Sequence, residues 1–454
     1  MSRISLKQAA AWCAGRVEPQ YEHVTFLGAN NDTRKLQAGE LFVALEGVRD
    51  GHDFIPAALQ KGASAVLCKH CEEDCPAIIV DDPRIALGRI AAGMRQHLNM
   101  QVVGVTGSVG KSTTKEMIAA VLSGDYTVSK TPANFNNDLG MPMSVLAMPE
   151  DTQVAVLEMG MNHFGEIRYL TQIAKPDVAV IINVGTMHIE NLGSREGILQ
   201  AKLEILEGLT ETGIAVMNGD NDLLWSCDPG RPVVYFGTHE GCAVRGSDIQ
   251  ENEEGLCFTV TAGERTFPVT LPVEGEHYVS DALAAVAVGL SKGVSPENIA
   301  LRLSCFRNME GRQEIFAEKG CTIIKDCYNA GPESMAAALM VLGKRKGRRI
   351  AVLGDMLELG DHADASHLQV GAVAAKQADV LLVYGPHGYL TVQGAVDAGM
   401  PVTATQAFSD REKMALALKK LVLPGDTLLF KGSHGMHMEL VLDQFLREDR
   451  DMEE

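Results

Sequence analysis

The chain has 454 residues, a formal net charge of −19 at pH 7 and a hydrophobic content of 46%. This length suits two to four domains with their own cores, and the acidic balance argues against nucleic acid or an anionic membrane as partner. No apolar run of about 18 residues and no signal-peptide pattern is found, so we expect no membrane span. Ten cysteines in so long a chain indicate reduced thiols rather than a disulfide framework, which predicts a cytoplasmic protein.

Residues 1–82 predict a small α/β unit with a helix over 6–14 and strands at 65–67 and 77–80. Polar turns that carry Arg and Lys beside short strands, such as Asp32-Thr33-Arg34, suit a phosphate or sugar ligand. On residue chemistry alone, solvated turn residues are the better interpretation of this patch.

A cysteine cluster follows within the same unit. Cys68, His70, Cys71 and Cys75 lie within eight residues and could ligate a metal. No second paired C-x-x-C follows at zinc-site spacing, which favours an acidic surface loop between two strands.

Residues 101–122 predict a buried strand, a tight loop and a helix, in that order. Backbone N–H groups of such a loop and the helix N-terminus favour a bound phosphate, Lys111 adds a positive charge, and the Ser112 hydroxyl can ligate Mg²⁺. The strict phosphate-loop pattern needs glycine at position 105, where this chain has Val105, so the motif is a variant. The alternative is a glycine-rich turn with a solvated lysine, but the strand and helix around it favour a phosphate site.

Further polar side chains follow later strands of the same predicted sheet. Glu158 ends the strand over 154–158, and His188 follows the strand over 177–184. Ligands of parallel sheets bind beyond the carboxyl ends of the strands, and Mg²⁺ prefers oxygen ligands such as Glu158. His188 taken alone is more often structural, and the amide-rich loop over 131–140 suits a turn as well as a ligand.

The next segments carry weaker signals. A helix over 194–208 contains Lys202 between apolar neighbours, for which a side chain that reaches the surface is the usual explanation. Short alternating runs over 232–272 predict a small antiparallel excursion, and a helix begins near His277.

From about residue 312 the alternation of strands and helices begins again and predicts a second doubly wound parallel sheet. The expected strands are residues 321–325, 349–353, 379–384 and 426–431, and the expected helices are residues 333–342, 366–376, 411–421 and 436–446. Residues 447–454 are a charged segment that we expect to fray.

Taken together, these residues resemble the Mur ligases, cytoplasmic ATP-dependent enzymes that form amide bonds in peptidoglycan synthesis. The resemblance runs essentially end to end and rests on residues 32–36, 41–47, 326–330 and 353–360. The last of these, LGDMLELG, is most specific to the branch that joins D-alanyl-D-alanine to UDP-N-acetylmuramoyl-tripeptide. The Asp-Asn-Pro-Arg signature of many diaminopimelate-adding members is not found.

The resemblance implies a three-domain α/β architecture. A small N-terminal α/β domain, 1–82, would bind the UDP-sugar-peptide, and a central phosphate-loop ATPase domain with a parallel sheet, 83–311, would bind ATP. A C-terminal Rossmann-like domain, 312–454, would contact ATP ribose and phosphate and the dipeptide. The implied cofactors are ATP and Mg²⁺, and we expect a monomer.

The resemblance also implies roles for single residues. It implies ATP contacts for Gly107, Ser108, Val109, Gly110, Lys111, Ser112, Thr113, Asn183, His277, Arg312 and Asp326. It implies metal contacts for Ser112, Glu158, His188 and Lys202, the last as a carbamylated lysine, with Lys111, His188 and Lys202 catalytic. It implies substrate contacts for Asp32, Thr33, Arg34, Asn134, Asn136, Asn137 and Asn329.

Three motifs depart from the family pattern. Tyr278 and Asp281 replace asparagines near the expected adenine site, His434 replaces an arginine, and the Asp-Asp-Ser-Tyr-Asn run reads Lys325-Asp326-Cys327-Tyr328-Asn329. Other interpretations are a sister amide ligase (diaminopimelate-adding or folylpolyglutamate-type), a phosphate-loop NTPase without ligation, and an inactive homologue. The sequence does not specify which diamino acid is third in the peptide.

Overall fold

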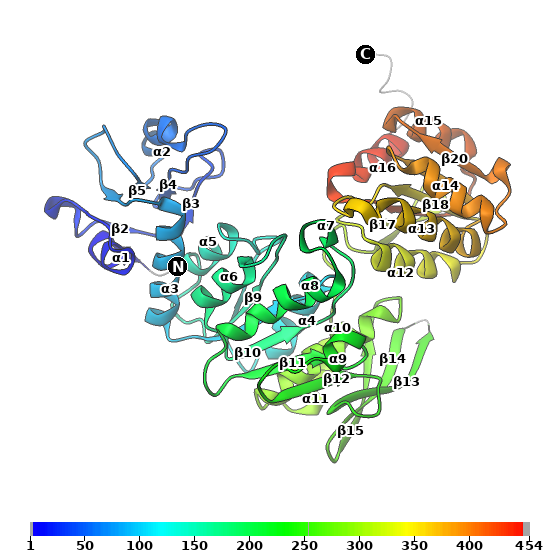
Figure 1. The fold of residues 1–454 in the computed structure, drawn as a ribbon, viewed down its shortest axis with the longest axis horizontal. Coiled ribbons are helices and arrows are strands. Elements are labelled where there is room, and N and C mark those ends of the chain that lie inside the picture. Colours follow the sequence, from blue (N-terminus) through cyan, green and yellow to red (C-terminus); the bar gives the residue numbers. More distant parts are fainter. Residues whose placement is uncertain (1–2, 253, 448–454) are drawn as a thin grey trace.

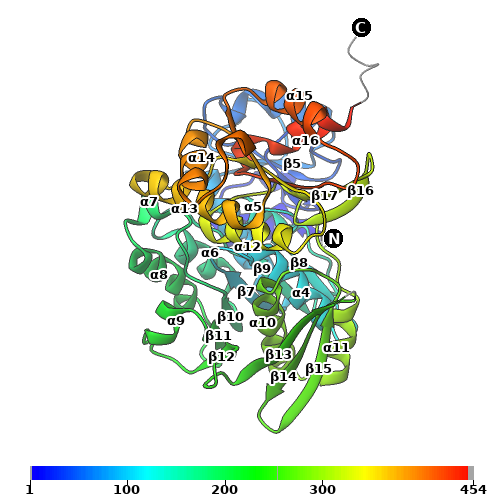
Figure 2. The same cartoon turned by 90° about the vertical axis from the view of Figure 1, so that its right-hand side faces the viewer.

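The computed structural model describes residues 3–252 and 254–447, and its strands form three main sheets (Figure 1). In Figure 1 the first and last sheets form separate lobes on either side of the central one, and Figure 2 shows the same arrangement from the side. Residues 448–454, the end of the charged segment expected to fray, lie outside the described residues. Among the described helices, none is long and apolar enough to cross a membrane.

The first sheet is parallel and has the order β3-β4-β5-β6. Its strands are β3 Ala29–Asn30, β4 Leu41–Val43, β5 Ala65–Cys68 and β6 Ala77–Ile79. A separate antiparallel pair, β1 Ile4–Ser5 and β2 Thr25–Phe26, and helices α1 Leu6–Cys13 and α2 Ile55–Gln60 complete this unit. The α/β prediction for this region is therefore confirmed.

The loop between β5 and β6 carries the cysteine cluster. Cys71 Sγ lies 3.5 Å from Cys75 Sγ, and all ten cysteines are free. The cluster is not among the described side-chain groups that lie close enough to share a cation.

The central sheet has nine strands in the order β15-β14-β13-β12-β11-β10-β7-β9-β8. Its strands are β7 Gln101–Thr106, β8 Val128–Lys130, β9 Val154–Glu158, β10 Val178–Ile181, β11 Ile214–Asn218, β12 Val233–Gly237, β13 Val244–Asn252, β14 Gly255–Ala262 and β15 Arg265–Leu271. The expectation of a separate antiparallel excursion over 232–272 is wrong in one respect. β12 pairs parallel with both β11 and β13, so only β13–β15 are antiparallel, and they extend the parallel sheet.

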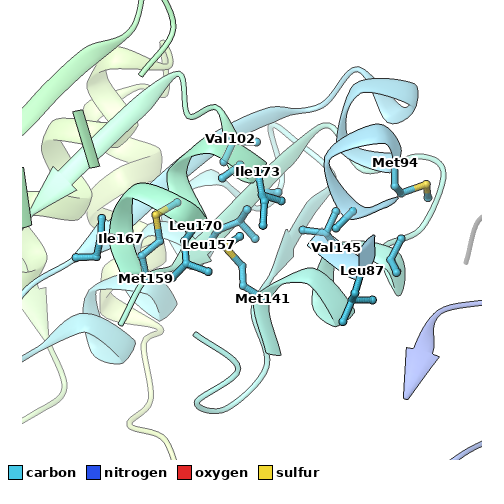
Figure 3. Packing of buried hydrophobic residues seen from close by; sticks show 14 of the residues in the cluster. Leu87, Met94, Val102, Met141, Val145, Leu157, Met159, Ile167, Leu170 and Ile173 are labelled. Atoms are coloured by element: carbon cyan, nitrogen blue, oxygen red, sulfur yellow. The ribbon is translucent and has the colours of Figure 1, made fainter. Parts of the chain in front are cut away.

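Helices cover both faces of the central sheet, which is why its parallel strands β7, β9 and β10 are nearly continuous apolar runs. They are α3 Pro83–Leu98, α4 Lys111–Leu122, α5 Gly140–Leu146, α6 Glu166–Ala174, α7 Ile189–Leu192, α8 Arg195–Leu203, α9 Asp222–Ser226, α10 His277–Ser291 and α11 Pro296–Ser304. Val102 of β7 belongs to one core with residues of α3, α5 and α6, and Figure 3 shows Leu87, Val145 and Leu170 of these helices in the same cluster. Val103 faces the other core, under α4 and α10. Alternate residues of one strand thus supply two cores.

The last sheet has the order β16-β17-β21-β18-β19-β20 and is parallel except at its edge strand β16. Its strands are β16 Glu314–Glu318, β17 Cys321–Asp326, β18 Arg349–Gly354, β19 Val380–Tyr384, β20 Thr405–Phe408 and β21 Thr427–Lys431. Its helices are α12 Pro332–Gly343, α13 Ala363–Gln377, α14 Gly388–Asp397, α15 Arg411–Leu421 and α16 Met438–Leu446. The doubly wound prediction is confirmed, although it omitted β16, α14 and β20.

Candidate functional site

The loop between β7 and α4 is held in one shape by a neighbouring strand end. Asn183, just after β10, accepts hydrogen bonds from the backbone N–H groups of Ser108 and Val109 at 2.9 Å, and its amide donates to the Val109 carbonyl. Gly110 has φ +86°, and a Cβ there would lie 2.5 Å from Asp281 Oδ1, so only glycine fits. The loop is therefore fixed by contacts on both sides.

Lys111 begins α4 and turns back over this loop. Its Nζ donates to the carbonyl oxygens of Gly107 at 2.8 Å and Ser108 at 3.3 Å. Burial lowers the pKa of Lys111, while the nearby Glu158 carboxylate opposes that shift. Its charge thus lies directly above the loop, where a phosphate would sit.

Glu158 ends β9 and is 2% exposed. Its Oε1 accepts a hydrogen bond from Asn136 at 2.8 Å, whereas its buried Oε2 has no hydrogen-bond partner. The nearest cation to Oε2 is the ammonium of buried Lys115, 3.5 Å away, which donates to the Thr131 carbonyl at 2.8 Å. A buried carboxylate oxygen without a donor fits a cation ligand, because leaving it unpaired is costly.

Arg312, between α11 and β16, reaches across to the phosphate loop. Its Nη2 donates to Ser112 Oγ at 2.9 Å, and its guanidinium lies 4.0 Å from the centre of the Tyr328 ring. Ser112 is 2% exposed. A side chain that precedes the last sheet therefore contacts the hydroxyl expected to bind a cation.

Two further contacts join the loop after β10 to the last sheet. Glu333, in the first turn of α12, accepts hydrogen bonds from the Thr186 backbone at 2.9 Å and hydroxyl at 3.0 Å. His188 has φ +64°, and its Nδ1 lies 2.7 Å from Glu358 Oε2. These contacts bring the carboxyl ends of β7, β9 and β10 against the C-terminal unit.

One cavity of about 470 Å³ lies between these units. Most residues predicted from the sequence line it: Ser108, Val109, Gly110, Lys111, Ser112, Thr113, Asn134, Asn136, Asn137, Glu158, Asn183, His188, His277, Arg312, Asp326 and Asn329. Its walls come from strand ends of two sheets, as expected for ligand sites in parallel α/β folds.

Comparison with known proteins decides the family. Three family models match: "Mur ligase family, catalytic domain" over residues 23–98, "Mur ligase middle domain" over 105–289, and "Mur ligase, glutamate ligase domain" over 311–434. The UDP-N-acetylmuramoyl-tripeptide–D-alanyl-D-alanine ligase of Bacillus subtilis is 40% identical over 98% of this chain and 99% of its own length. The chain belongs to the Mur ligase family.

Solved structures agree with this assignment. A crystal structure of MurF from Acinetobacter baumannii matches with a TM-score of 0.91 and 30% identity, over 99% of this chain and 100% of that one. The MurF ligase of Thermotoga maritima in complex with ADP matches with a TM-score of 0.83 and 31% identity, over 94% and 98% of the two chains. The three-domain Mur ligase fold predicted from the sequence is therefore confirmed.

Some of the predicted site residues of this Mur ligase do not line the cavity. Asp32, Thr33 and Arg34 lie in the N-terminal unit, where Arg34 pairs with Asp32 at 2.8 Å. Gly107 packs behind the loop, and a Cβ there would lie 3.0 Å from Ile182. A ligand that contacts both Asp32–Arg34 and the cavity must therefore be long enough to reach from one to the other.

Lys202, in α8, is 1% exposed and also lies outside the cavity lining. Burial and the neighbouring Lys111 hold the pKa of Lys202 well below its usual value. A neutral lysine amine is the form that can react with CO₂, so the chemistry of this residue fits the carbamylation that the family resemblance implies.

Sequence reasoning assigned no role to several residues of the Mur ligase cavity. Glu333, Tyr328 and Lys431 line it, and Lys431 donates to Asp326 Oδ2 at 2.6 Å. Lys431 ends β21, so the rule that ligands bind beyond strand ends could have found it. Glu333 lies in the first turn of α12, where the rule on strand ends does not apply.

The departures at positions 278 and 281 lie in this cavity as well. The Tyr278 hydroxyl accepts a hydrogen bond from Asn308 Nδ2 at 3.0 Å. Burial lowers the pKa of the neighbouring His277 to about 4, so its imidazole is neutral at pH 7. His277 therefore adds no charge to the cavity wall at pH 7.

Asp281 gives this Mur ligase a testable pH dependence. Burial raises its pKa to about 7, and Thr114 Oγ1 donates to its Oδ1 at 2.8 Å. Between about pH 4 and pH 7 the folded protein keeps a proton on Asp281 that the unfolded chain has already released. The contribution of Asp281 to the free energy of unfolding therefore falls as pH rises to about 7 and then levels off. We expect Asp281→Asn to melt at a higher temperature than wild type near pH 8, with a smaller difference near pH 5. Calorimetry at both pH values checks this, and a difference that does not grow with pH would contradict it.

Proposed function

We propose that this Mur ligase joins D-alanyl-D-alanine to UDP-N-acetylmuramoyl-tripeptide with cleavage of ATP to ADP and phosphate, a step of cytoplasmic peptidoglycan precursor synthesis. One observation carries the proposal: a phosphate-loop lysine, a buried carboxylate and side chains of a second α/β unit meet in one cavity. The activity for which the Bacillus subtilis relative is named supports the choice of substrates, since that relative matches 98% of this chain.

ATP binds with its phosphates on the loop before α4. Backbone N–H groups and the α4 N-terminus stabilise the negative charge, and Lys111 exchanges its two carbonyl partners for phosphate oxygens. Arg312 leaves Ser112 and adds a second positive charge, and Asp326 contacts the ribose. The ADP bound in the Thermotoga maritima MurF structure supports a nucleotide in this fold.

In this proposal Ser112 would hold a first Mg²⁺ ion, Glu158 and His188 would belong to the metal site, and a carbamylated Lys202 would hold a second Mg²⁺ ion. These ions would supply charge neutralisation at the transferred phosphoryl group. The unpartnered Oε2 of Glu158 and the hydroxyl of Ser112 are oxygen donors of the kind that Mg²⁺ prefers. Asn136, which donates to Glu158 Oε1, orients that carboxylate.

The reaction proceeds in two steps. A peptide carboxylate oxygen attacks the γ-phosphorus in line, the bond to the β–γ bridging oxygen breaks, and ADP and an acyl phosphate form. The amine of the dipeptide then attacks the acyl carbon, loses a proton, and expels phosphate with formation of the amide. Lys111 and Arg312 stabilise charge that develops in the first step, and closure of the cavity between the two units excludes water.

The remaining ligand contacts follow from the chain's arrangement. Asp32–Arg34 bind the uridine diphosphate end, Asn134, Asn136 and Asn137 contact the sugar-peptide near the phosphate loop, and Asn329 contacts the dipeptide. We propose that the enzyme acts as a monomer, because all these groups belong to one chain.

The test is phosphate release from ATP and Mg²⁺ with UDP-N-acetylmuramoyl-tripeptide, with and without D-alanyl-D-alanine. We expect release that depends on both substrates, together with the mass of the UDP-pentapeptide. Release without an acceptor would indicate an NTPase, and release with only a free amino acid would indicate a sister ligase. No release with any acceptor would indicate an inactive homologue.

A further inference from the structure

The segment Leu353–Gly360 has no role in the chemistry described so far, although it is the most distinctive motif of the sequence. Its first residues end β18, and its last residues reach the central unit. A Cβ on Gly360 would lie 2.9 Å from Glu190 Cγ, so the motif packs directly against α7. Between these ends, Glu358 contacts His188 across the boundary of the two units.

Three neighbouring elements fix the motif before Glu358. Asp355 is fully buried, and its Oδ2 accepts a hydrogen bond from the His387 backbone at 2.8 Å. The Met356 N–H donates to His367 Nε2 at 3.1 Å, and the Leu357 N–H donates to Ser433 Oγ at 2.9 Å. The backbone that carries Glu358 is therefore anchored to α13, to the turn before α14 and to the end of β21.

The backbone of Glu358 itself is in an uncommon conformation. Its φ is +62°, in the left-handed region that non-glycine residues rarely adopt. Such strain persists only where surrounding contacts impose it, and it occurs often at ligand sites. Here the Glu358 carboxylate lies against His188, while about half of the side chain stays exposed to solvent.

Glu358 lines a second cavity of about 210 Å³, which adjoins the larger one. The two cavities share Asn134, Met187, His188, Tyr328 and Asn329. Glu358 is the only carboxylate in the lining of the smaller cavity, and its contact with His188 puts it where the two meet. A positively charged group bound to Glu358 would therefore lie beside His188, which lines both cavities.

We infer that Glu358 binds the ammonium group of the acceptor dipeptide and holds it at the junction of the two cavities. The inference rests on the proposed function and specifies how the acceptor is recognised. An N⁺–H donor and a carboxylate form a charge-assisted hydrogen bond, roughly twice as strong as a neutral one. The acceptor's other end then extends into the smaller cavity, beside Ser433 and His434.

The test compares Glu358→Gln with wild type, and uses Asp361→Asn, an exposed carboxylate directly after this segment, as the control. We expect the KM for D-alanyl-D-alanine to rise at least about tenfold in Glu358→Gln, with little change for ATP or UDP-N-acetylmuramoyl-tripeptide. N-propionyl-D-alanine lacks the amine, so its inhibition constant should be equal in wild type and Glu358→Gln. Asp361→Asn should match wild type in every constant.

Two results would overturn the inference. One is an unchanged KM for the dipeptide in Glu358→Gln. The other is an equal loss of affinity for the dipeptide and for N-propionyl-D-alanine, which would mean that Glu358 shapes the cavity without recognising charge. A wild-type enzyme that ignores the dipeptide altogether would instead refute the proposed function, so the two failures are distinguishable.

Discussion

Lys111→Met should lower turnover at saturating substrates at least about a thousandfold while the protein stays folded. Methionine keeps a long apolar side chain but removes the ammonium that now bonds the Gly107 and Ser108 carbonyls. The charge that builds up on the transferred phosphoryl group would then lose its nearest protein cation. Phosphate release under the full substrate mixture measures the effect.

Lys413→Met is the matched control, because Lys413 is exposed on α15, far along the chain from the loop. We expect this variant to turn over at the wild-type rate, and both variants to melt within a few degrees of wild type. Near-normal activity of a folded Lys111→Met protein would contradict the role assigned to the phosphate loop.

Arg312→Lys should lower turnover by about a hundredfold, although it keeps the positive charge. The guanidinium donates to Ser112 while it lies over the Tyr328 ring, and an ammonium cannot keep both contacts in one plane. The loss should fall mainly on kcat, because Arg312 reaches the phosphate loop from the C-terminal side. Steady-state kinetics with ATP varied separates kcat from KM.

Arg307→Lys is the control for this substitution. Arg307 is exposed and donates only to the carbonyl of its neighbour Phe306, so the change should leave kcat unaltered. Equal activity of Arg312→Lys and wild type would mean that the contact with Ser112 has no part in the reaction.

The local signals in the sequence were sufficient for the elements that carry the phosphate loop. The apolar run before Gly107 and the helical spacing after Lys111 predicted β7 and α4, because strand burial and helix periodicity are local properties. The rule that strand ends form sites also predicted that Glu158 and His188 would meet near the loop, and both line one cavity.

The omitted elements had weak or misleading local patterns. Helix α14 contains Gly388 and Gly394 together with β-branched residues, which lowers its helix propensity. Strand β12 precedes an antiparallel hairpin and was expected to belong to it, whereas its parallel pairing with β11 and β13 makes it part of the parallel sheet. Neither helix α14 nor the pairing of β12 can be predicted from its own residues without the neighbouring strands.

Contacts between the units could not be predicted either. Arg312 and Ser112 are 200 residues apart, and Glu358 and His188 belong to different sheets, so both contacts depend on how the units pack. The unpartnered oxygen of Glu158 and the anchoring of Lys115 are likewise tertiary properties. Family resemblance suggested roles for several of these positions, but not the partners found here.

The acyl phosphate is tested most directly by following oxygen from the peptide carboxylate. UDP-N-acetylmuramoyl-tripeptide labelled with ¹⁸O in its reacting carboxylate is incubated with ATP, Mg²⁺ and D-alanyl-D-alanine, and the released phosphate is analysed by mass. We expect one labelled oxygen in each phosphate, because the carboxylate oxygen that attacks the γ-phosphorus leaves with it. Unlabelled phosphate alongside pentapeptide formation would show that no acyl phosphate forms in this cavity.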